Sequence, residues 1–489
     1  MVELLKILLG DDLMHYTEIA ISKPFEGAPK INLPDIFGAS PNKPLILRIA
    51  VTGERPIKYS ADNLPSGLVL ENGIITGCVA EEGIYPIIIK AENSLGKSEK
   101  TINLEIKENC VLLTPLMGFT SWNAYAANVS QEKMERATKL MVESGICEYG
   151  YSYINTDSGW QKEYGGKYDA IMPNNKFPDM KKMCDTIHSY GLKCGIYSTP
   201  MLTAWGCPNE FESIPGCTQG EPDELFADTN CGIGVIRKEK NNVQQWTEWG
   251  FDYLKYDWYP CDPYNAELMR KELIASPRDF GYCVTVAARP EYTNYWSKYC
   301  NCYRNGVDSF GRWHTFMDIY RTYESFITSM TKGHFFDLDM LDIGDCDLFP
   351  EGCQYTEDEQ ILVYSLRAFM GSPIQISAKL DNLTEFQLSV YCNEEIIALN
   401  QDIAFKSAKP MVMIENGEKC FHTYKRKLHD GSYAVMLLNL GKVADRIQVY
   451  LDEYSSVRDL WAKKDLEKTD VLNIYMEPHT VRIFKITED

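Results

Sequence analysis

Two charged side chains, Lys255 and Asp257, lie in the middle of the aromatic and apolar segment FDYLKYDWYP, residues 251–260. A buried charge costs several kcal/mol of folding free energy unless it is paired or used in chemistry. Alternate residues of a β-strand share a face, so Lys255 and Asp257 point to the same side as Tyr253 and Tyr259. Either that face is exposed to solvent, or the two charges serve a reaction.

Polar and aromatic side chains also stand at the ends of the other strands expected in this region. They are Trp122, Asp157, Tyr197, Asp308 and Asp339. Carboxylates combined with a lysine, an arginine and aromatic rings suit glycoside hydrolysis, in which one carboxylate is the nucleophile or base and another is the acid. Lys255 would help to keep Asp257 ionised, as a nucleophile requires. Arg304, four residues before Asp308, could position or polarise the second carboxylate.

Other classes of chemistry lack their sequence signatures. The chain has no glycine-rich phosphate loop, no GxSxG elbow and no HExxH motif. Its seven histidines form no obvious ligand set, and its sixteen cysteines show no paired CxxC spacing. We therefore expect neither a metal site nor a cofactor.

The region from 111 to 402 repeats one pattern, in which a helix, a glycine, a short apolar strand and polar residues follow one another. We predict a helix in SQEKMERATKLMVESGI, capped by Ser130 and ended by Gly145. Its apolar stripe consists of Met134, Ala137, Leu140 and Met141. Eight strand candidates separated by helices predict a parallel (β/α)8 TIM barrel. Such barrels react at the carboxyl ends of their strands, which places Asp257 at the mouth and Lys255 one layer below.

Three regions flank this barrel, so the predicted fold class is multidomain. Residues 1–23 form an N-terminal leader segment, and residues 24–110, with short alternating strands and tight turns, predict an immunoglobulin-like β-sandwich module. Residues 403–489 return to a β pattern and predict a C-terminal antiparallel β-sandwich domain. The Gly-, Pro- and Cys-rich stretch from Thr203 to Lys240 follows the third barrel strand and is a candidate wall or lid.

The composition limits the partners of the protein. A formal net charge of −20 over 489 residues would repel phosphates, so we expect neither nucleic acid nor an anionic membrane. Aromatic residues are plentiful, with 30 Tyr, 19 Phe and 9 Trp, and such rings stack on sugars as readily as they fill cores. The N-terminus lacks a cleavage site, and no run is long enough to span a membrane. We expect a cytoplasmic protein, or a secreted or periplasmic one if a leader was removed.

Six segments resemble, in order, the barrel motifs of the family 27 glycoside hydrolases, which include α-galactosidases and α-N-acetylgalactosaminidases. They are PLMGFTSWNAY, YINTDSGW, GLKCGIY, YLKYD, YRNGVD and DLDML, between residues 114 and 405. The resemblance implies a retaining double displacement with Asp257 as nucleophile and Asp308 as acid/base. It also implies sugar contacts from Trp122, Asp157, Tyr197, Lys255, Arg304 and Asp339. The N-terminal module likewise resembles the immunoglobulin-like modules found beside bacterial glycosidases.

The sequence departs from the family pattern where specificity is set. Family members usually have two adjacent acids that hold the galactose hydroxyls at C4 and C6, but here Ser158 takes the second place. The segment CVTVAARPEY, where the family sets tolerance for hydroxyl or acetamido at C2, matches neither usual version. Its Arg289 is either exposed or meets an anionic or unusual substituent. The resemblance also places Cys207 with Cys261, and Cys283 with Cys300, like family disulfide pairs, which argues against a cytoplasmic location.

The expected function is therefore a retaining exo-glycosidase acting on the terminal α-galactose of an oligosaccharide or glycoside. The alternatives are the same mechanism on an α-N-acetylgalactosaminide, a β-L-arabinopyranoside or an α-glucoside, or a catalytically silent carbohydrate-binding barrel. A retaining mechanism predicts a separation of about 5–5.5 Å between the two carboxyl groups. Assembly into a homo-oligomer is left open by the sequence.

Overall fold

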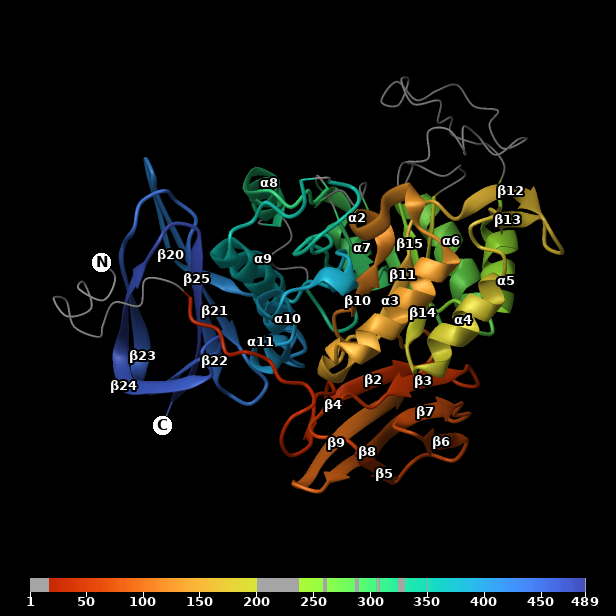
Figure 1. Ribbon diagram of the computed structural model, residues 1–489, viewed down its shortest axis with the longest axis horizontal. Coiled ribbons are helices and arrows are strands. Elements are labelled where there is room, and N and C mark those ends of the chain that lie inside the picture. Colours follow the sequence, from red (N-terminus) through yellow and green to blue (C-terminus); the bar gives the residue numbers. More distant parts are fainter. Residues whose placement is uncertain are drawn as a thin grey trace. The chain divides into compact units, whose positions relative to one another are not determined.

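The computed structural model describes residues 17–199, 237–257, 262–285, 290–304, 306, 308–323, 330–349 and 351–488 (Figure 1). Several positions named above lie outside the described residues: Cys207, Tyr259, Cys261, Arg289 and most of the stretch from Thr203 to Lys240. The chain divides into two compact units. The larger contains Lys23–Cys353 and Pro373–Leu383, and the smaller contains Met1–Ser22, Gln354–Ser372 and Thr384–Asp489.

Eight parallel strands form a curled sheet in the larger unit. In chain order they are β10 (Met117–Thr120), β11 (Tyr153–Thr156), β14 (Lys193–Ser198), β15 (Tyr253–Tyr256), β16 (Gly281–Val284), β17 (Cys302–Tyr303), β18 (Phe335–Phe336) and β19 (Ile374–Ile376). From β10 to β18 each strand pairs with the next in this order, and β19 pairs with β10. A bridge between Leu341 and Ile376 spans the remaining seam. This arrangement confirms the predicted (β/α)8 barrel.

The interior of the barrel is filled by side chains from several strands. They are Leu116, Tyr153, Tyr253, Cys283 and Cys302. The rings of Tyr153 and Tyr253 meet edge to face, with centroids 5.9 Å apart. Tyr253 therefore points inward as its alternation predicts, whereas Tyr256 lies beside Tyr282, with ring centroids 6.1 Å apart.

Helices follow the barrel strands along the chain and surround them (Figure 1). They are α3 (Gln131–Glu143), α4 (Met180–Ser189), α5 (Glu239–Trp249), α6 (Pro263–Ala275), α7 (Thr293–Tyr299) and α8 (Trp313–Tyr323); a hairpin of β12 (Gln161–Gly165) and β13 (Ala170–Pro173) follows β11. Along the described ranges, no helix is both long and apolar enough to cross a membrane.

Helix α3 begins and ends at the predicted residues. The Ser130 hydroxyl accepts a hydrogen bond from the Lys133 N–H at 3.2 Å, and Gly145 takes the left-handed conformation, with φ of 80°. Of the predicted apolar stripe, Met134, Ala137 and Met141 are buried and Leu140 is half-buried, and Thr138 is buried beside them. Burial of Thr138 is tolerated because its hydroxyl donates to the Met134 carbonyl at 2.8 Å.

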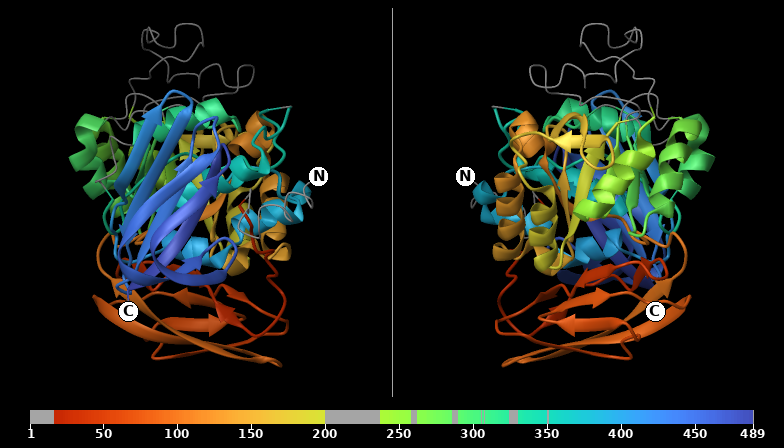
Figure 2. Two further views of the ribbon diagram at one scale, coloured as in Figure 1. Left: turned by 90° about the vertical axis from the view of Figure 1, so that its left-hand side faces the viewer. Right: turned by 90° about the vertical axis from the view of Figure 1, so that its right-hand side faces the viewer.

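The N-terminal module is a sandwich of two sheets with a shared apolar core. One sheet contains β2 (Ile36–Ala39), β9 (Gly96–Ile106), β8 (Gly83–Asn93) and β5 (Lys58–Asp62), and the other β3 (Leu45–Arg48), β7 (Ile74–Gly77) and β6 (Leu68–Glu71). The short strands β1 (Lys30–Ile31) and β4 (Val51–Thr52) pair with each other. Figure 2 shows these sheets as a layer beneath the barrel helices of the same unit.

A buried carboxylate joins this module to the barrel. Glu148 follows α3 and is 2% exposed. Its Oε1 lies 2.6 Å from Arg48 and 3.1 Å from Arg55, both in the module, and its Oε2 accepts from the Val51 N–H at 3.1 Å. Removal of one partner from a buried ion pair costs about 3–5 kcal/mol, so these contacts hold the two parts firmly together.

The described part of the smaller unit combines an antiparallel sheet with three helices. Its strands lie in the order β20 (Lys409–Asn416), β21 (Lys419–Lys427), β22 (Tyr433–Asn439), β25 (Thr480–Glu488), β23 (Asp445–Asp459) and β24 (Lys464–Met476). Its helices are α9 (Glu357–Met370), α10 (Glu385–Tyr391) and α11 (Glu394–Asn400). Arg426 of β21 is buried and donates to the carbonyl groups of Ala368 and Phe369 at the end of α9. The sheet therefore packs against a helix of its own unit through β21.

Candidate active site

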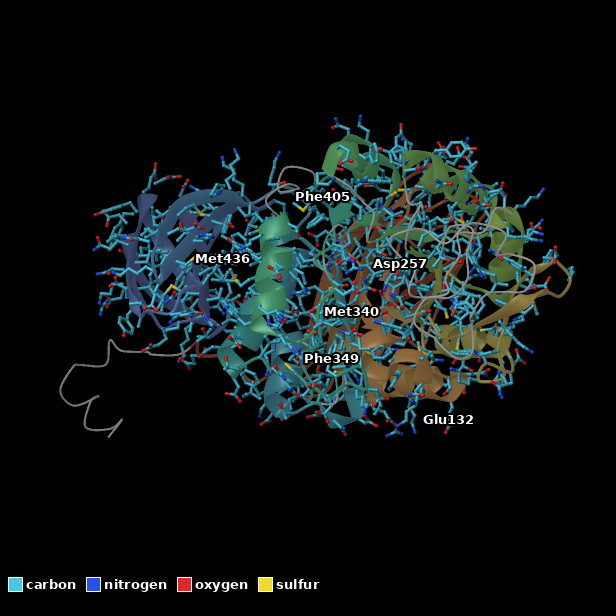
Figure 3. All side chains as sticks on the ribbon, turned by 90° about the horizontal axis from the view of Figure 1, so that it is seen from above. Glu132, Asp257, Met340, Phe349, Phe405 and Met436 are labelled. Carbon is cyan, nitrogen blue, oxygen red and sulfur yellow. The ribbon has the colours of Figure 1, made fainter. Side chains whose placement is uncertain are left out.

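A pocket of about 150 Å³ lies at the carboxyl ends of the barrel strands, where barrel enzymes react. Nine of the ten side chains predicted from the sequence line it: Trp122, Asp157, Ser158, Tyr197, Lys255, Asp257, Arg304, Asp308 and Asp339. The tenth, Arg289, lies outside the described residues. Seen from above, Asp257 and Met340 lie within the ring of barrel helices (Figure 3).

Asp257 comes directly after β15 and is 7% exposed. The Tyr197 hydroxyl donates to its Oδ2 at 3.0 Å, and the Thr285 hydroxyl donates to its Oδ1. The backbone N–H of Asp257 donates to the Ser198 carbonyl at 2.9 Å. Both carboxylate oxygens are thus held in a defined orientation, which a nucleophile needs.

The surroundings of Asp257 also set its ionisation. Burial raises the pKa of Asp257 above its ordinary value, against the opposing influence of Lys255, Arg304 and the Thr285 hydrogen bond. Burial together with the Asp257 charge raises the pKa of Tyr197 as well, so the phenol stays protonated and donates to the carboxylate. The result is a carboxylate more basic than one in water.

Lys255 contacts Asp157 rather than Asp257. Its Nζ lies 2.8 Å from Asp157 Oδ2 and 5.6 Å from the centre of the Tyr197 ring. Burial works to lower the pKa of Lys255, but the charges of Asp157 and Asp257 outweigh it and raise the pKa. The lysine therefore remains a cation and influences Asp257 through its charge rather than through a hydrogen bond.

Ser158 follows Asp157 at the end of β11 and is 2% exposed. Its backbone N–H donates to Asp157 Oδ1 at 2.8 Å. Asp157 in turn is 2% exposed, and its own N–H donates to the Ser121 hydroxyl at 2.9 Å. The pocket therefore has one carboxylate and one neutral serine side by side on this strand end.

Arg304, which directly follows β17, bridges two carboxylates of the pocket lining. Its guanidinium lies 2.8 Å from Asp308 Oδ1 and 2.9 Å from Asp339 Oδ2. Asp339 is fixed further by the Ser309 N–H at 2.6 Å and has a left-handed backbone, with φ of 67°. A non-glycine residue in that conformation is held there by its surroundings, and such positions gather at functional sites.

Asp308 differs from Asp257 in exposure and in ionisation. Its side chain is 51% exposed. Burial works to raise the pKa of Asp308, but the charge and hydrogen bond of Arg304 outweigh it and hold the pKa below its ordinary value. In the unliganded site Asp308 is therefore a carboxylate paired with Arg304.

Part of the lining is apolar. It is formed by Trp122 of α2 (Ser121–Tyr125) together with Phe310, Met340 and Leu348. Opposite charges in the lining do not balance, because four carboxylates face only Lys255 and Arg304. The pocket thus offers an apolar surface for the face of a sugar ring and a net negative charge for a positively charged reacting centre.

Sequence reasoning missed several residues of the site, among them Asn123, Thr285, Phe310 and Leu348. Thr285 could have been found, because it follows the last residue of β16 just as Asp257 follows the last residue of β15. Phe310 and Leu348 lie in irregular segments, where no periodicity indicates which way a side chain points.

The disulfide that the resemblance placed between Cys283 and Cys300 is absent, and both residues are buried thiols. Cys283 belongs to the barrel interior, where its register partner is Cys302 of β17. Cys300 ends α7 instead. No disulfide joins any of the twelve cysteines among the described residues, and the pair Cys207 and Cys261 lies outside them.

Comparisons with known proteins agree with this geometry. The family described as "Alpha galactosidase A" matches residues 114–402, and the "Alpha galactosidase C-terminal beta sandwich domain" matches residues 418–486. Alpha-galactosidase A of Cellvibrio japonicus is 27% identical over 412 residues, which cover 76% of this chain and 92% of that protein. Alpha-galactosidase 2 of Arabidopsis thaliana is 24% identical over 398 residues, covering 78% and 91%.

Solved structures give the same picture. A Bacteroides fragilis protein assigned as an α-galactosidase has a TM-score of 0.83 at 26% identity and covers 96% of this chain and 100% of its own. Alpha-galactosidase I of Mortierella vinacea has a TM-score of 0.66 at 24% identity, covering 78% and 98%. A family 27 β-L-arabinopyranosidase from Geobacillus stearothermophilus has a TM-score of 0.65 at 22% identity, covering 77% and 97%.

Proposed function

Because this chain belongs to the α-galactosidase A family within the family 27 glycoside hydrolases, we propose that it hydrolyses terminal α-galactosides by a retaining double displacement. The observation that carries the proposal is that two carboxylates in one pocket differ in burial and in hydrogen bonding. Asp257 is buried and held by two hydroxyl donors, whereas the Asp308 side chain is half-exposed in the segment that follows β17. The first setting suits a nucleophile, and the second suits a group that exchanges protons with the leaving group and water.

In the first step Asp257 attacks the anomeric carbon, a carbon–oxygen bond to the enzyme forms, and the bond to the leaving oxygen breaks. Asp308 gives its proton to that oxygen. In the second step a water molecule attacks the anomeric carbon and gives a proton back to Asp308, which frees Asp257. Tyr197 and Thr285 keep the attacking carboxylate aligned throughout.

Asp308 must carry a proton to act as an acid, yet Arg304 holds its pKa below the ordinary range in the unliganded site. We infer that substrate entry loosens the contact between Asp308 and Arg304. Arg304 retains Asp339 as a second partner at 2.9 Å, so the guanidinium stays paired when Asp308 turns toward the glycosidic oxygen. Burial by the sugar then raises the pKa of Asp308, because burial already acts in that direction.

Asp157 and Lys255 are proposed to hold the hydroxyl groups of the sugar. Their side chains line the pocket as a buried ion pair whose remaining donors and acceptors can face a ligand. Charged groups make the stronger hydrogen bonds to hydroxyls, so the pair anchors the ring next to Asp257. The apolar face of the sugar would rest on Trp122, as aromatic rings favour.

A second candidate is a β-L-arabinopyranoside, and Ser158 favours it. This buried serine replaces one of two acids that would otherwise hold the C4 and C6 hydroxyls, and arabinopyranose lacks the C6 hydroxymethyl group. The Geobacillus β-L-arabinopyranosidase shares the fold of this chain. A neutral hydroxyl at position 158 binds a C6 hydroxyl more weakly than a carboxylate does, so preference between the two sugars rests on this residue.

The test is a panel of nitrophenyl glycosides carrying α-galactose, α-N-acetylgalactosamine, β-L-arabinopyranose and α-glucose. We expect α-galactoside hydrolysis by the wild-type protein, abolished in Asp257→Ala without loss of folding. Fastest turnover of the arabinopyranoside would replace the first candidate by the second. Measurable sugar binding with no hydrolysis of any substrate would refute both and indicate a silent carbohydrate-binding barrel.

A further inference from the structure

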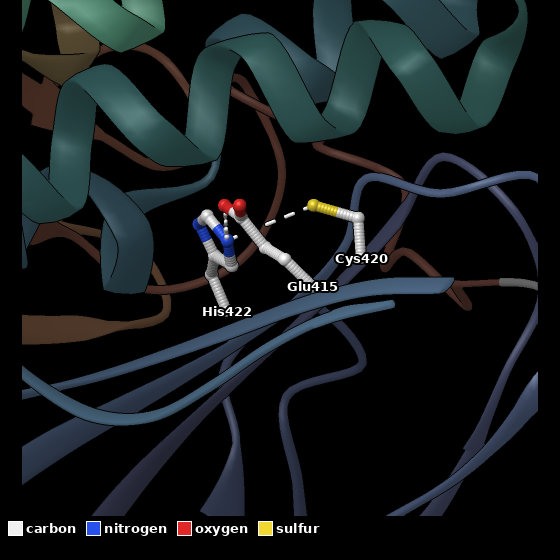
Figure 4. Close-up of side chains that lie close together, drawn as sticks. All are labelled: Glu415, Cys420 and His422. Carbon is white, nitrogen blue, oxygen red and sulfur yellow. Dashed lines mark hydrogen bonds and ion pairs between the residues drawn. The ribbon is translucent and has the colours of Figure 1, made fainter. Parts of the chain in front are cut away.

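Three side chains of different ligand types converge on one hairpin of the smaller unit. Glu415 of β20 is the register partner of Cys420 of β21, and His422 lies two residues farther along β21, so all three share one face. One ligand atom from each lies within 4.8 Å of the other two. Figure 4 shows the three side chains pointing toward one another above the strands. Among the described residues, this is the one such group of three histidine, cysteine or acidic side chains.

We propose that Glu415, Cys420 and His422 bind a divalent zinc ion. A thiolate, an imidazole and a carboxylate are the three ligand types that zinc takes in proteins, commonly three at a time with water as the fourth. The Glu415 side chain is 73% exposed, which leaves a path for the ion and the water from solvent. Sequence reasoning expected no metal site because it looked for CxxC spacing, and this set has a Cys-x-His pair on one strand and its third member across the turn.

The distances fit a tetrahedral zinc site. Bonds of about 2.3 Å to sulfur and about 2.0–2.1 Å to nitrogen at the tetrahedral angle place the two ligand atoms about 3.6 Å apart. Cys420 Sγ lies 3.6 Å from His422 Nε2. Glu415 Oε1 lies 2.9 Å from the same nitrogen, closer than the roughly 3.3 Å of a zinc-bound pair. The exposed Glu415 side chain can withdraw by that small amount when the ion enters.

Two of the ligands are already held in place by the hairpin. His422 is 3% exposed, and the next residue, Thr423, accepts from the Val412 N–H at 2.8 Å across the strands. A tight turn at Gly417, with φ of 62°, joins the two strands one residue pair beyond Glu415 and Cys420. Prior order of this kind lowers the entropy cost of closing a metal site. Binding releases the Cys420 thiol proton to solvent, so affinity falls as pH falls.

The bland explanation of the same geometry is a hydrogen bond between Glu415 and His422 with a thiol nearby. The variant Glu415→Gln separates the two explanations, because glutamine can still hydrogen-bond the imidazole but is a poor zinc ligand. Cys420→Ser removes the thiolate and changes little else at a half-buried position. Cys353→Ser alters a half-buried cysteine of the larger unit and is the matched control.

The experiment strips the full chain of metal and titrates it with Co²⁺, whose thiolate complexes absorb by charge transfer, then displaces the cobalt with Zn²⁺. We expect one equivalent to bind with a charge-transfer band in the wild-type protein and in Cys353→Ser. We expect no band in Cys420→Ser and zinc affinity lowered about tenfold or more in Glu415→Gln. No band in the wild-type protein, or a band that survives Cys420→Ser, would overturn the proposal. Unchanged glycoside hydrolysis by Cys420→Ser would show that the variant is folded and that catalysis does not depend on the proposed zinc site.

Discussion

Replacement of Thr285 by valine removes one of the two hydroxyl donors to Asp257 and nearly keeps the shape of the side chain. Thr285 is 2% exposed, so water cannot readily take the place of its hydroxyl. A hydrogen bond to a charged group contributes about 1.5–3 kcal/mol. If all of it is lost from the transition state, kcat/KM at the pH optimum falls by about 10- to 100-fold.

The same change has a definite sign in the pH profile. The Thr285 hydroxyl stabilises the charged form of Asp257 and so works to lower its pKa. Without this donor the pKa rises further above its ordinary value, and the acid limb of kcat/KM moves to higher pH. Hydrolysis of nitrophenyl α-galactoside across the pH range measures both effects. Thr285→Ser keeps the donor and should restore the wild-type limb.

If Thr285 served packing alone, Thr285→Ser, which loses the methyl group, would lower the unfolding temperature more than Thr285→Val, and the acid limb would stay where it is in both variants. A wild-type rate and an unmoved acid limb in Thr285→Val would refute the role assigned to this hydroxyl. The two readouts together therefore distinguish positioning of the nucleophile from ordinary core packing.

Asp308→Ala should slow hydrolysis of glycosides with poor leaving groups by about 100- to 10,000-fold and nitrophenyl glycosides less, since only the former need an acid; an equal loss across a leaving-group series contradicts the assignment. Proton NMR should detect the α-anomer of the sugar first, and the β-anomer first would indicate inversion and a wider carboxyl separation. Glu148→Gln should cost about 3–5 kcal/mol in the free energy of unfolding, because Arg48 and Arg55 lose their buried partner. Urea unfolding measures this, and a loss under about 1 kcal/mol, typical of a surface pair, would contradict it.

The barrel could be predicted because two signals in the sequence mark its strands: a short apolar run and a polar residue that follows the run. Asp157, Asp257 and Arg304 all directly follow a strand. Strand alternation assigned Tyr253 to the interior because the period of two leaves no freedom. These local rules, together with the family resemblance that singled out Ser158, indicated nine side chains that line one pocket.

Features that depend on distant partners could not be predicted in this way. Lys255 was expected to act on Asp257, its neighbour on the same face of the strand. Its ammonium group instead pairs with the carboxylate of Asp157, which comes from another strand. Cys283 was paired with Cys300 by resemblance, although the barrel register sets it against Cys302. The apolar stripe of α3 does not by itself reveal that Thr138 is buried while Leu140 is only half-buried.

Both cations that neutralise Glu148 come from the N-terminal module, which limits how such a chain can be shortened or recombined. A barrel expressed without the module would retain the Glu148 carboxylate but lose both arginines that pair with it. A barrel joined to a foreign module would need arginines at two matching places, or a neutral residue at 148. The module and its barrel therefore form one engineering unit, because neither can be exchanged without a matching change at position 148 or at its two arginines.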